Sequence, residues 1–159
     1  MGKMIVVNAS VCSGCRICEM VCSIKHEGVV NPARSRIRVI QHESVLLDVP
    51  VLCKQCESPP CAAVCPTDAI KRDEKLNQVI IDYELCIGCK ICVAACPFGA
   101  MGFDTKARKV INCDLCDGDP ECVKFCSVKA IECVDDSLAN LKKARAGSYK
   151  TREQVRQLG

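Results

Sequence analysis

Closely spaced cysteines constrain what this chain can fold into more than any other feature of its sequence. The clearest run is Cys86-Ile-Gly-Cys89-Lys-Ile-Cys92-Val-Ala-Ala-Cys96-Pro97, with the spacing Cys-x2-Cys-x2-Cys-x3-Cys-Pro. This spacing is typical of iron–sulfur ligation, in which three thiolates hold one [4Fe–4S] cluster and the fourth ligates a neighbouring cluster. One such run therefore predicts a partner run elsewhere in the chain.

Three further runs supply possible partners. Numbered in chain order, the run at Cys86 is the third, and the first run repeats its compact spacing at Cys12, Cys15, Cys18 and Cys22. The second and fourth runs have a longer middle loop and consist of Cys53, Cys56, Cys61 and Cys65, and of Cys113, Cys116, Cys122 and Cys126. Spacing alone leaves two ways of sharing clusters: first run with second and third with fourth, or first with fourth and second with third.

Disulfides and zinc are weaker explanations of the 17 cysteines in 159 residues. Such a content usually indicates a secreted disulfide scaffold, but residues 1–7 are too short to form the apolar core of a secretory leader. Four-cysteine zinc sites usually combine two separate Cys-x2-Cys pairs. Short runs of four cysteines therefore favour iron–sulfur ligation.

Short apolar or alternating segments separate the runs and predict small strands. We expect them at 4–8, 36–41, 45–49, 68–72, 78–82, 97–103, 109–112 and 130–134. All but the first and last are placed to form hairpins, so 4–8 could pair with 130–134, which favours joining the first run to the fourth. Proline after Cys65 and Cys96, against serine after Cys22 and Cys126, favours the same grouping.

Several residues outside the runs need an interpretation. Gly14 and Gly88 occupy the same place in the two compact runs, where glycine permits a positive φ or a close backbone approach. The alternation also places three arginines on one strand face, as a solvated stripe or a docking surface: Arg34, Arg36 and Arg38. We do not expect His26 or His42 to be ligands, because sixteen thiolates are better placed. Cys133 shares a strand face with Ile131 and is expected to be a buried structural thiol, with a redox or alternative-ligand role as the other possibility.

The composition changes after residue 135. Residues 136–159 contain six Lys or Arg and two Asp or Glu, and their pattern predicts two short helices. We therefore expect a four-cluster domain at 1–135 and a basic helical C-terminal tail at 136–159. The tail is either a solvated cap on the fold or an arm that contacts a partner or another copy of the chain.

Other classes of protein are disfavoured. No apolar stretch approaches the 18 residues of a membrane span, so we expect a soluble protein in a reducing cytoplasm. The formal charge of +3 does not imply a nucleic-acid partner, because cluster-bound thiolates add negative charge and aromatic residues are only 3% of the chain. No nucleotide-binding glycine motif or histidine-centred triad is present, so we do not expect an enzyme.

The four runs, in the order compact, extended, compact, extended, resemble the four-cluster ferredoxin-like electron-transfer subunits of large redox complexes. The resemblance covers about residues 1–135, and the segments 22–28, 31–37 and 113–120 look like the soluble branch of that family. The nearest likeness is the small iron–sulfur subunit of tungsten-dependent aldehyde oxidoreductases. The resemblance implies an α+β fold of tandem bacterial-ferredoxin-like lobes, with short β-hairpins and short helices around four [4Fe–4S] clusters.

The nested ligation of the family, carried over residue by residue, implies four sites. One cluster would be held by Cys12, Cys15, Cys18 and Cys126, and its lobe neighbour by Cys113, Cys116, Cys122 and Cys22. In the other lobe, one cluster would be held by Cys53, Cys56, Cys61 and Cys96, and the last by Cys86, Cys89, Cys92 and Cys65. The lobes would thus combine runs 12–22 with 113–126 and runs 53–65 with 86–96.

The same resemblance implies the function. We expect a non-catalytic subunit that carries electrons between a large catalytic oxidoreductase subunit, of the tungsten- or molybdenum-pterin aldehyde oxidoreductase type, and a second redox subunit or soluble electron carrier. The alternatives are a free polyferredoxin, or the electron-transfer subunit of a hydrogenase or carbon monoxide dehydrogenase complex. Self-association through the C-terminal tail is a further expectation.

Overall fold

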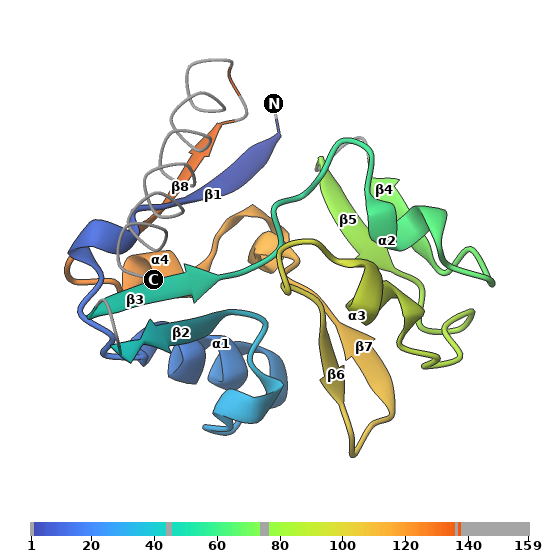
Figure 1. The fold of residues 1–159 in the computed structure, drawn as a ribbon, viewed down its shortest axis with the longest axis horizontal. Helices are drawn as coiled ribbons and strands as arrows, with labels where there is room; N and C mark the ends of the chain where they lie inside the picture. Colours follow the sequence, from blue (N-terminus) through green and yellow to red (C-terminus); the bar gives the residue numbers. More distant parts are fainter. Residues whose placement is uncertain (1, 44–45, 74–76, 136, 138–159) are drawn as a thin grey trace.

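The computed structural model describes residues 2–43, 46–73, 77–135 and 137. These residues form four two-stranded antiparallel sheets and four short α-helices (Figure 1). This is the small α+β, ferredoxin-like type of fold that the sequence predicts. The predicted helices of the C-terminal tail lie outside the described residues.

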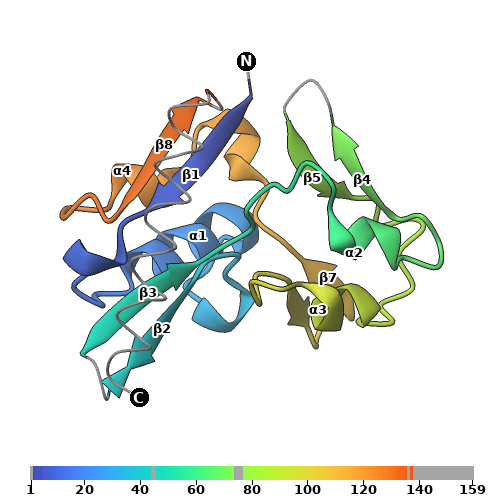
Figure 2. The same ribbon diagram turned by 45° about the horizontal axis from the view of Figure 1, so that its top comes forward.

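The first sheet joins segments that are far apart in the chain. Strand β1 (Lys3–Val7) pairs antiparallel with β8 (Ile131–Asp135), so that Val7 lies opposite Ile131. Both views of the ribbon show the two strands side by side (Figures 1 and 2). The predicted pairing of 4–8 with 130–134 is confirmed, and it brings the first cysteine run to the fourth.

The other three sheets are hairpins between consecutive cysteine runs. They consist of β2 (Arg38–His42) with β3 (Leu47–Val51), β4 (Ile70–Asp73) with β5 (Gln78–Ile81), and β6 (Gly102–Asp104) with β7 (Lys109–Ile111). The predicted strand pairs are confirmed, although β2, β3 and β4 begin two residues later than expected and β6 begins five residues later. Each hairpin leads the chain from one ligand run to the next.

The helices begin inside the cysteine runs. They are α1 (Ile17–Glu27), α2 (Pro60–Ala63), α3 (Ile91–Ala95) and α4 (Glu121–Lys124). The N-caps of α1 and α3 are the equivalent residues Arg16 and Lys90, with left-handed φ values of 56° and 65°. The N-caps of α2 and α4 are Pro59 and Pro120, whose fixed φ suits entry into a helix. Helix α1 has 11 residues and is longer than the short helices that the resemblance implies.

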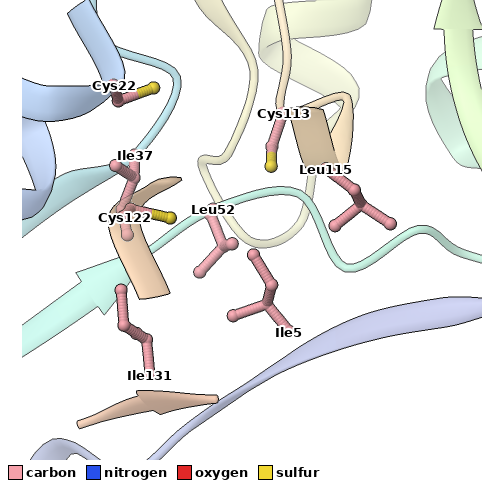
Figure 3. Packing of buried hydrophobic residues seen from close by; sticks show 8 residues of the cluster. All are labelled: Ile5, Cys22, Ile37, Leu52, Cys113, Leu115, Cys122 and Ile131. Carbon is pink, nitrogen blue, oxygen red and sulfur yellow. The ribbon is translucent and has the colours of Figure 1, made fainter. Parts of the chain in front are cut away.

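The buried side chains form two clusters. The first contains Ile5, Cys22, Ile37, Leu52, Cys113, Leu115, Cys122 and Ile131, and Figure 3 shows its three cysteine sulfurs among the aliphatic side chains. The second contains Cys61, Ile70, Val79, Cys92, Met101 and Val110. Cys53 packs against both clusters. Cysteines thus occupy positions that large apolar side chains fill in ordinary cores, which explains how a chain with few aromatic residues forms an interior.

The expected stripe of three arginines is wrong. Arg34 lies in a 3-10 turn and Arg36 in a loop, so only Arg38 belongs to a strand. Their guanidinium groups bind distant segments instead: they contact the carboxylates of Asp104 and Asp114 and the carbonyl of Met101. Strand alternation could not predict this, because these partners lie more than 60 residues away in the sequence.

Within the described part of the chain, none of the helices combines the length and the apolar character needed to cross a bilayer.

Candidate iron–sulfur sites

A cavity lies where the first cysteine run meets the end of the fourth. Four thiols line it, and they are the set that the resemblance groups together: Cys12, Cys15, Cys18 and Cys126. Cys126 reaches this position because β1 pairs with β8 and α1 packs on α4. Burial raises the pKa of Cys12, and so do the nearby thiolates of Cys126 and Cys15. Four soft thiolates around one cavity fit an iron–sulfur cluster, because iron coordination removes the cost of gathering them.

The remaining cysteines of these two runs lie in the first hydrophobic cluster or close to it. Cys22, Cys113 and Cys122 are buried there. Burial raises the pKa of Cys122 to about 12, and the neighbouring thiolates of Cys22 and Cys116 contribute to that rise. The structure therefore brings together Cys22, Cys113, Cys116 and Cys122.

The second run lies beside the last cysteine of the third. Burial raises the pKa of both Cys56 and Cys61, and the thiolate of Cys96 raises both values further. Burial raises the pKa of Cys53 to about 11, and the thiolates of Cys56 and Cys61 add to the rise. Cys96 therefore lies close to the cysteines of the second run, which is the neighbour that the nested grouping gives it.

The first three cysteines of the third run lie around helix α3. Burial raises the pKa of Cys92 to about 11, and the thiolates of Cys89 and Cys86 add to the rise. Cys65 packs against the same hydrophobic cluster as Cys86 and Cys92. Cys89 itself is exposed, which places this group at the surface of the molecule.

The last cysteine of several runs accepts a hydrogen bond from the backbone. The N–H groups of Arg36, Ala69 and Ala130 lie 3.3, 3.3 and 3.2 Å from the sulfurs of Cys22, Cys65 and Cys126, respectively. Burial raises the pKa of Cys22 and Cys65, but hydrogen bonds outweigh it and leave both lowered. Such bonds favour the thiolate form that binds iron, and hydrogen bonds to sulfur also adjust cluster potentials.

His26 lies one helical turn beyond Cys22. Its Nδ1 is 2.8 Å from the carbonyl oxygen of Cys22 and 3.8 Å from the sulfur, and its Nε2 is 3.2 Å from each carboxylate oxygen of Asp114. The hydrogen bond with Asp114 is the main reason that the pKa of His26 rises to about 10. Arg36 also pairs with Asp114. His26 is therefore a cation held against a candidate ligand.

This role of His26 was not predicted from the sequence. The available signal was its position four residues after Cys22, because residues four apart lie on the same face of a helix. That signal depends on knowing that 17–27 is one helix, and no helix was assigned to these residues from the sequence.

The glycines of the two compact runs are required by geometry, as predicted. Gly14 and Gly88 have φ values of +66° and +68°. A Cβ atom on Gly14 would lie 2.5 Å from a carboxylate oxygen of Asp48, and one on Gly88 would lie 2.6 Å from the carbonyl oxygen of Arg108. A side chain would strain the backbone at both positions. At Gly88 it would also clash with fixed backbone, whereas at Gly14 the carboxylate of Asp48 could move aside.

Cys133 lies in strand β8, opposite Ile5. Cys133 is only partly buried, so the expectation of a buried thiol is not met. Burial is nevertheless the largest influence on the thiol and raises its pKa.

The fold and the grouped thiols together define an iron–sulfur protein of the ferredoxin-like class. A 4Fe-4S dicluster domain model matches residues 45–136, which is more than half of the chain. The chain belongs to this family of 4Fe-4S ferredoxin-like electron-transfer subunits.

Curated relatives agree with this assignment. The chain is 43% identical over 122 residues to the polyferredoxin-like subunit of aliphatic sulfonate oxidoreductase from Pyrococcus furiosus, covering 77% of this chain and 70% of the relative. It is 41% identical over 147 residues to the putative electron transport protein YsaA of Escherichia coli, covering 85% and 91%. It is also 37% identical over 158 residues to the Escherichia coli electron transport protein HydN, covering 85% and 89%. These names describe electron-transport proteins or subunits, which agrees with a non-catalytic role.

Solved structures show the same fold. A chain of the active-site complex BamBC of benzoyl coenzyme A reductase, bound to benzoyl-CoA, is similar with a TM-score of 0.52 and 27% identity. The similarity covers 94% of this chain and 89% of that one.

Proposed function

We propose that the chain is the electron-transfer subunit of an oxidoreductase complex and relays electrons through four [4Fe–4S] clusters. The observation that supports this most directly is the cavity where Cys126 joins Cys12, Cys15 and Cys18, because a shared cluster needs a cysteine from a distant run. A bound [4Fe–4S] cluster supplies one-electron transfer at a potential between about −700 and +450 mV, set by charge, hydrogen bonds and solvent access.

The proposed ligands are the four nested sets of cysteines given above. They divide residues 1–135 into two lobes, one built from runs 12–22 and 113–126 and the other from runs 53–65 and 86–96. The two hydrophobic clusters support this division, since each contains cysteines of one pair of runs. The tail at 136–159 would be a separate basic segment that contacts a partner or a second copy.

The partners follow from the family. One would be a large catalytic subunit. Because the chain resembles the small iron–sulfur subunit of tungsten-dependent aldehyde oxidoreductases, a tungsten- or molybdenum-pterin enzyme is our choice for that partner. The other would be a second redox subunit or a soluble electron carrier. We place this complex in a reducing cytoplasm, because free thiols in such numbers persist only where disulfides do not form.

Anaerobic affinity purification from the native host tests this function. A tagged chain should elute from gel filtration together with a larger subunit, and the substrate of that subunit should bleach the visible absorbance of the clusters. Elution of the chain alone, near its mass of 17.3 kDa, with clusters that no co-purified enzyme reduces, would contradict the proposal and favour a free polyferredoxin.

A further inference from the structure

Exposed apolar side chains flank the exposed Cys89 in the sequence. They are Leu85, Ile87, Ile91 and Phe98, and Ile87 retains 68% of its accessible surface. We call these four side chains, together with Cys89, the Cys89 face. Scattered apolar side chains are normal on protein surfaces, but here four exposed ones fall within 14 residues of the chain on both sides of an exposed candidate ligand, which makes this segment a candidate site of interaction.

Cations border the Cys89 face. The exposed basic residues between positions 84 and 109 are Lys90, Lys106, Arg108 and Lys109. The acidic residues of the same segment are Glu84, which is exposed, and Asp104, which is buried and paired with Arg34. The border is therefore predominantly positive.

Two of these cations contact aromatic rings. The Nζ atom of Lys90 lies 4.1 Å from the centroid of the Phe103 ring, and that of Lys109 lies 5.0 Å from the centroid of Tyr83. Gly88 sits close against the backbone of Arg108. The loop 86–90 and the turn between β6 and β7 thus form one continuous surface.

A second exposed cysteine, Cys15, offers a comparison. Val11, Phe125 and Val128 are exposed near that end of the first run. The charges near Cys15 are mixed, however. The cation of Arg16, which donates a hydrogen bond to Gln41, and the anion of Asp48, which lies against Gly14, are both close to this cysteine. The positive border distinguishes the Cys89 face.

We propose that the Cys89 face docks an acidic protein that carries single electrons, of the soluble ferredoxin type. This inference rests on the proposed function, since the face adjoins the cluster assigned to Cys86, Cys89, Cys92 and Cys65. The apolar centre supplies contact area, and the basic border attracts and orients a negatively charged partner. Charge complementarity selects this carrier over a neutral protein or a second copy of this basic surface.

The test measures binding to the cluster-loaded protein under anaerobic conditions. The probe is an acidic two-cluster bacterial ferredoxin, titrated calorimetrically at low and moderate salt. We expect binding that weakens as salt rises, and a loss of about tenfold in affinity for the double variant Arg108→Glu/Lys109→Glu. Ile87→Ser should weaken binding at both salt concentrations, because it removes apolar contact.

The matched control reverses the same number of positive charges at positions outside the Cys89 face. Lys25→Glu/Lys71→Glu reverses two exposed cations outside the Cys89 face, on α1 and β4. It should leave the affinity within about twofold of the unmodified chain, as distant surface charges are screened. An equal loss in both double variants, or none in either, would overturn the docking surface.

Two further outcomes would also overturn it. One is salt-sensitive self-association that Arg108→Glu/Lys109→Glu abolishes, since that would assign the face to another copy. The other is crosslinking of the Cys89 face to the catalytic subunit. Iron content and dithionite bleaching are measured on the same samples, so that full clusters without carrier binding contradict only the docking surface, whereas missing clusters contradict the proposed function.

Discussion

The side-chain amide nitrogen of Gln55 donates a hydrogen bond to the carbonyl oxygen of Cys113 at 2.7 Å. The amide oxygen of Gln55 accepts from the N–H of Val79 at 2.6 Å, and the side chain is almost fully buried. One residue thus connects the second cysteine run to the fourth run and to strand β5. Cys53, two residues earlier, packs against both hydrophobic clusters. The two groups of cysteines meet at this point.

Gln55→Leu should therefore destabilise the junction. It leaves the Val79 N–H and the Cys113 carbonyl buried without their partner, and each such group costs about 1–3 kcal/mol. We expect a loss of roughly 2–6 kcal/mol in the free energy of unfolding, followed anaerobically in guanidinium by visible absorbance. Gln41→Leu makes the same chemical change at an exposed position, where it removes only the hydrogen bond from Arg16, and should cost less than about 1 kcal/mol. Equal midpoints for the two variants would contradict this role of Gln55.

His26→Gln should lower the reduction potential of one cluster. A cation beside Cys22 stabilises the extra negative charge of a reduced cluster, so its removal disfavours reduction. We expect a fall of tens of millivolts in one midpoint of a redox titration monitored by electron paramagnetic resonance. His42→Gln, on strand β2, is the control and should move no midpoint. An unchanged set of midpoints in His26→Gln would show that the histidine only supports the fold.

Gly88→Ala and Gly99→Ala separate steric clash from backbone strain. Both glycines have positive φ, but a Cβ on Gly88 would meet the Arg108 carbonyl, whereas one on Gly99 would have no atom within 4 Å. Gly99→Ala should cost about 1–2 kcal/mol, the usual penalty of a left-handed residue. Gly88→Ala should cost more and should displace the loop that holds Cys86 and Cys89, seen as slower cluster assembly. Equal stability and assembly rates would refute the close approach.

The fold was predictable wherever local spacing determined it. The turn-forming residues between the runs indicated three hairpins, and the strand at 4–8 without a hairpin mate indicated its pairing with 130–134. The helix at 17–27 was not predicted at its full length, although Ile17, Met20, Val21 and Ile24 recur at helical spacing. The apolar pattern would also have misled about its orientation, because Ile17, Met20 and Ile24 are exposed whereas Glu19, Cys22 and Ser23 are buried.

The surroundings of the sites were less predictable than the cysteines. Arg34 and Arg36 appeared as surface residues in a strand pattern, yet they pair with Asp104 and Asp114. Those partners lie 70 and 78 residues away, so that only the folded chain reveals them. The ligand candidates were identifiable because thiolate spacing within a run is local, while the cation at His26 depends on a contact between distant runs.

Cys126→Ser should remove one cluster selectively. The cavity lined by Cys12, Cys15, Cys18 and Cys126 would lose its fourth ligand, so we expect about four iron atoms fewer per chain, or conversion to a three-iron centre with a loss of about one. Cys133→Ser is the matched control, because this cysteine belongs to none of the proposed sets. Equal iron content in the two variants would contradict the proposed ligand.

Iron and acid-labile sulfide counted on the anaerobically reconstituted chain test the central claim most directly. Four [4Fe–4S] clusters predict about sixteen iron atoms and as many sulfides per chain, with a Mössbauer spectrum of cubane clusters only. A value of about eight or fewer after complete reconstitution would contradict the four-cluster relay.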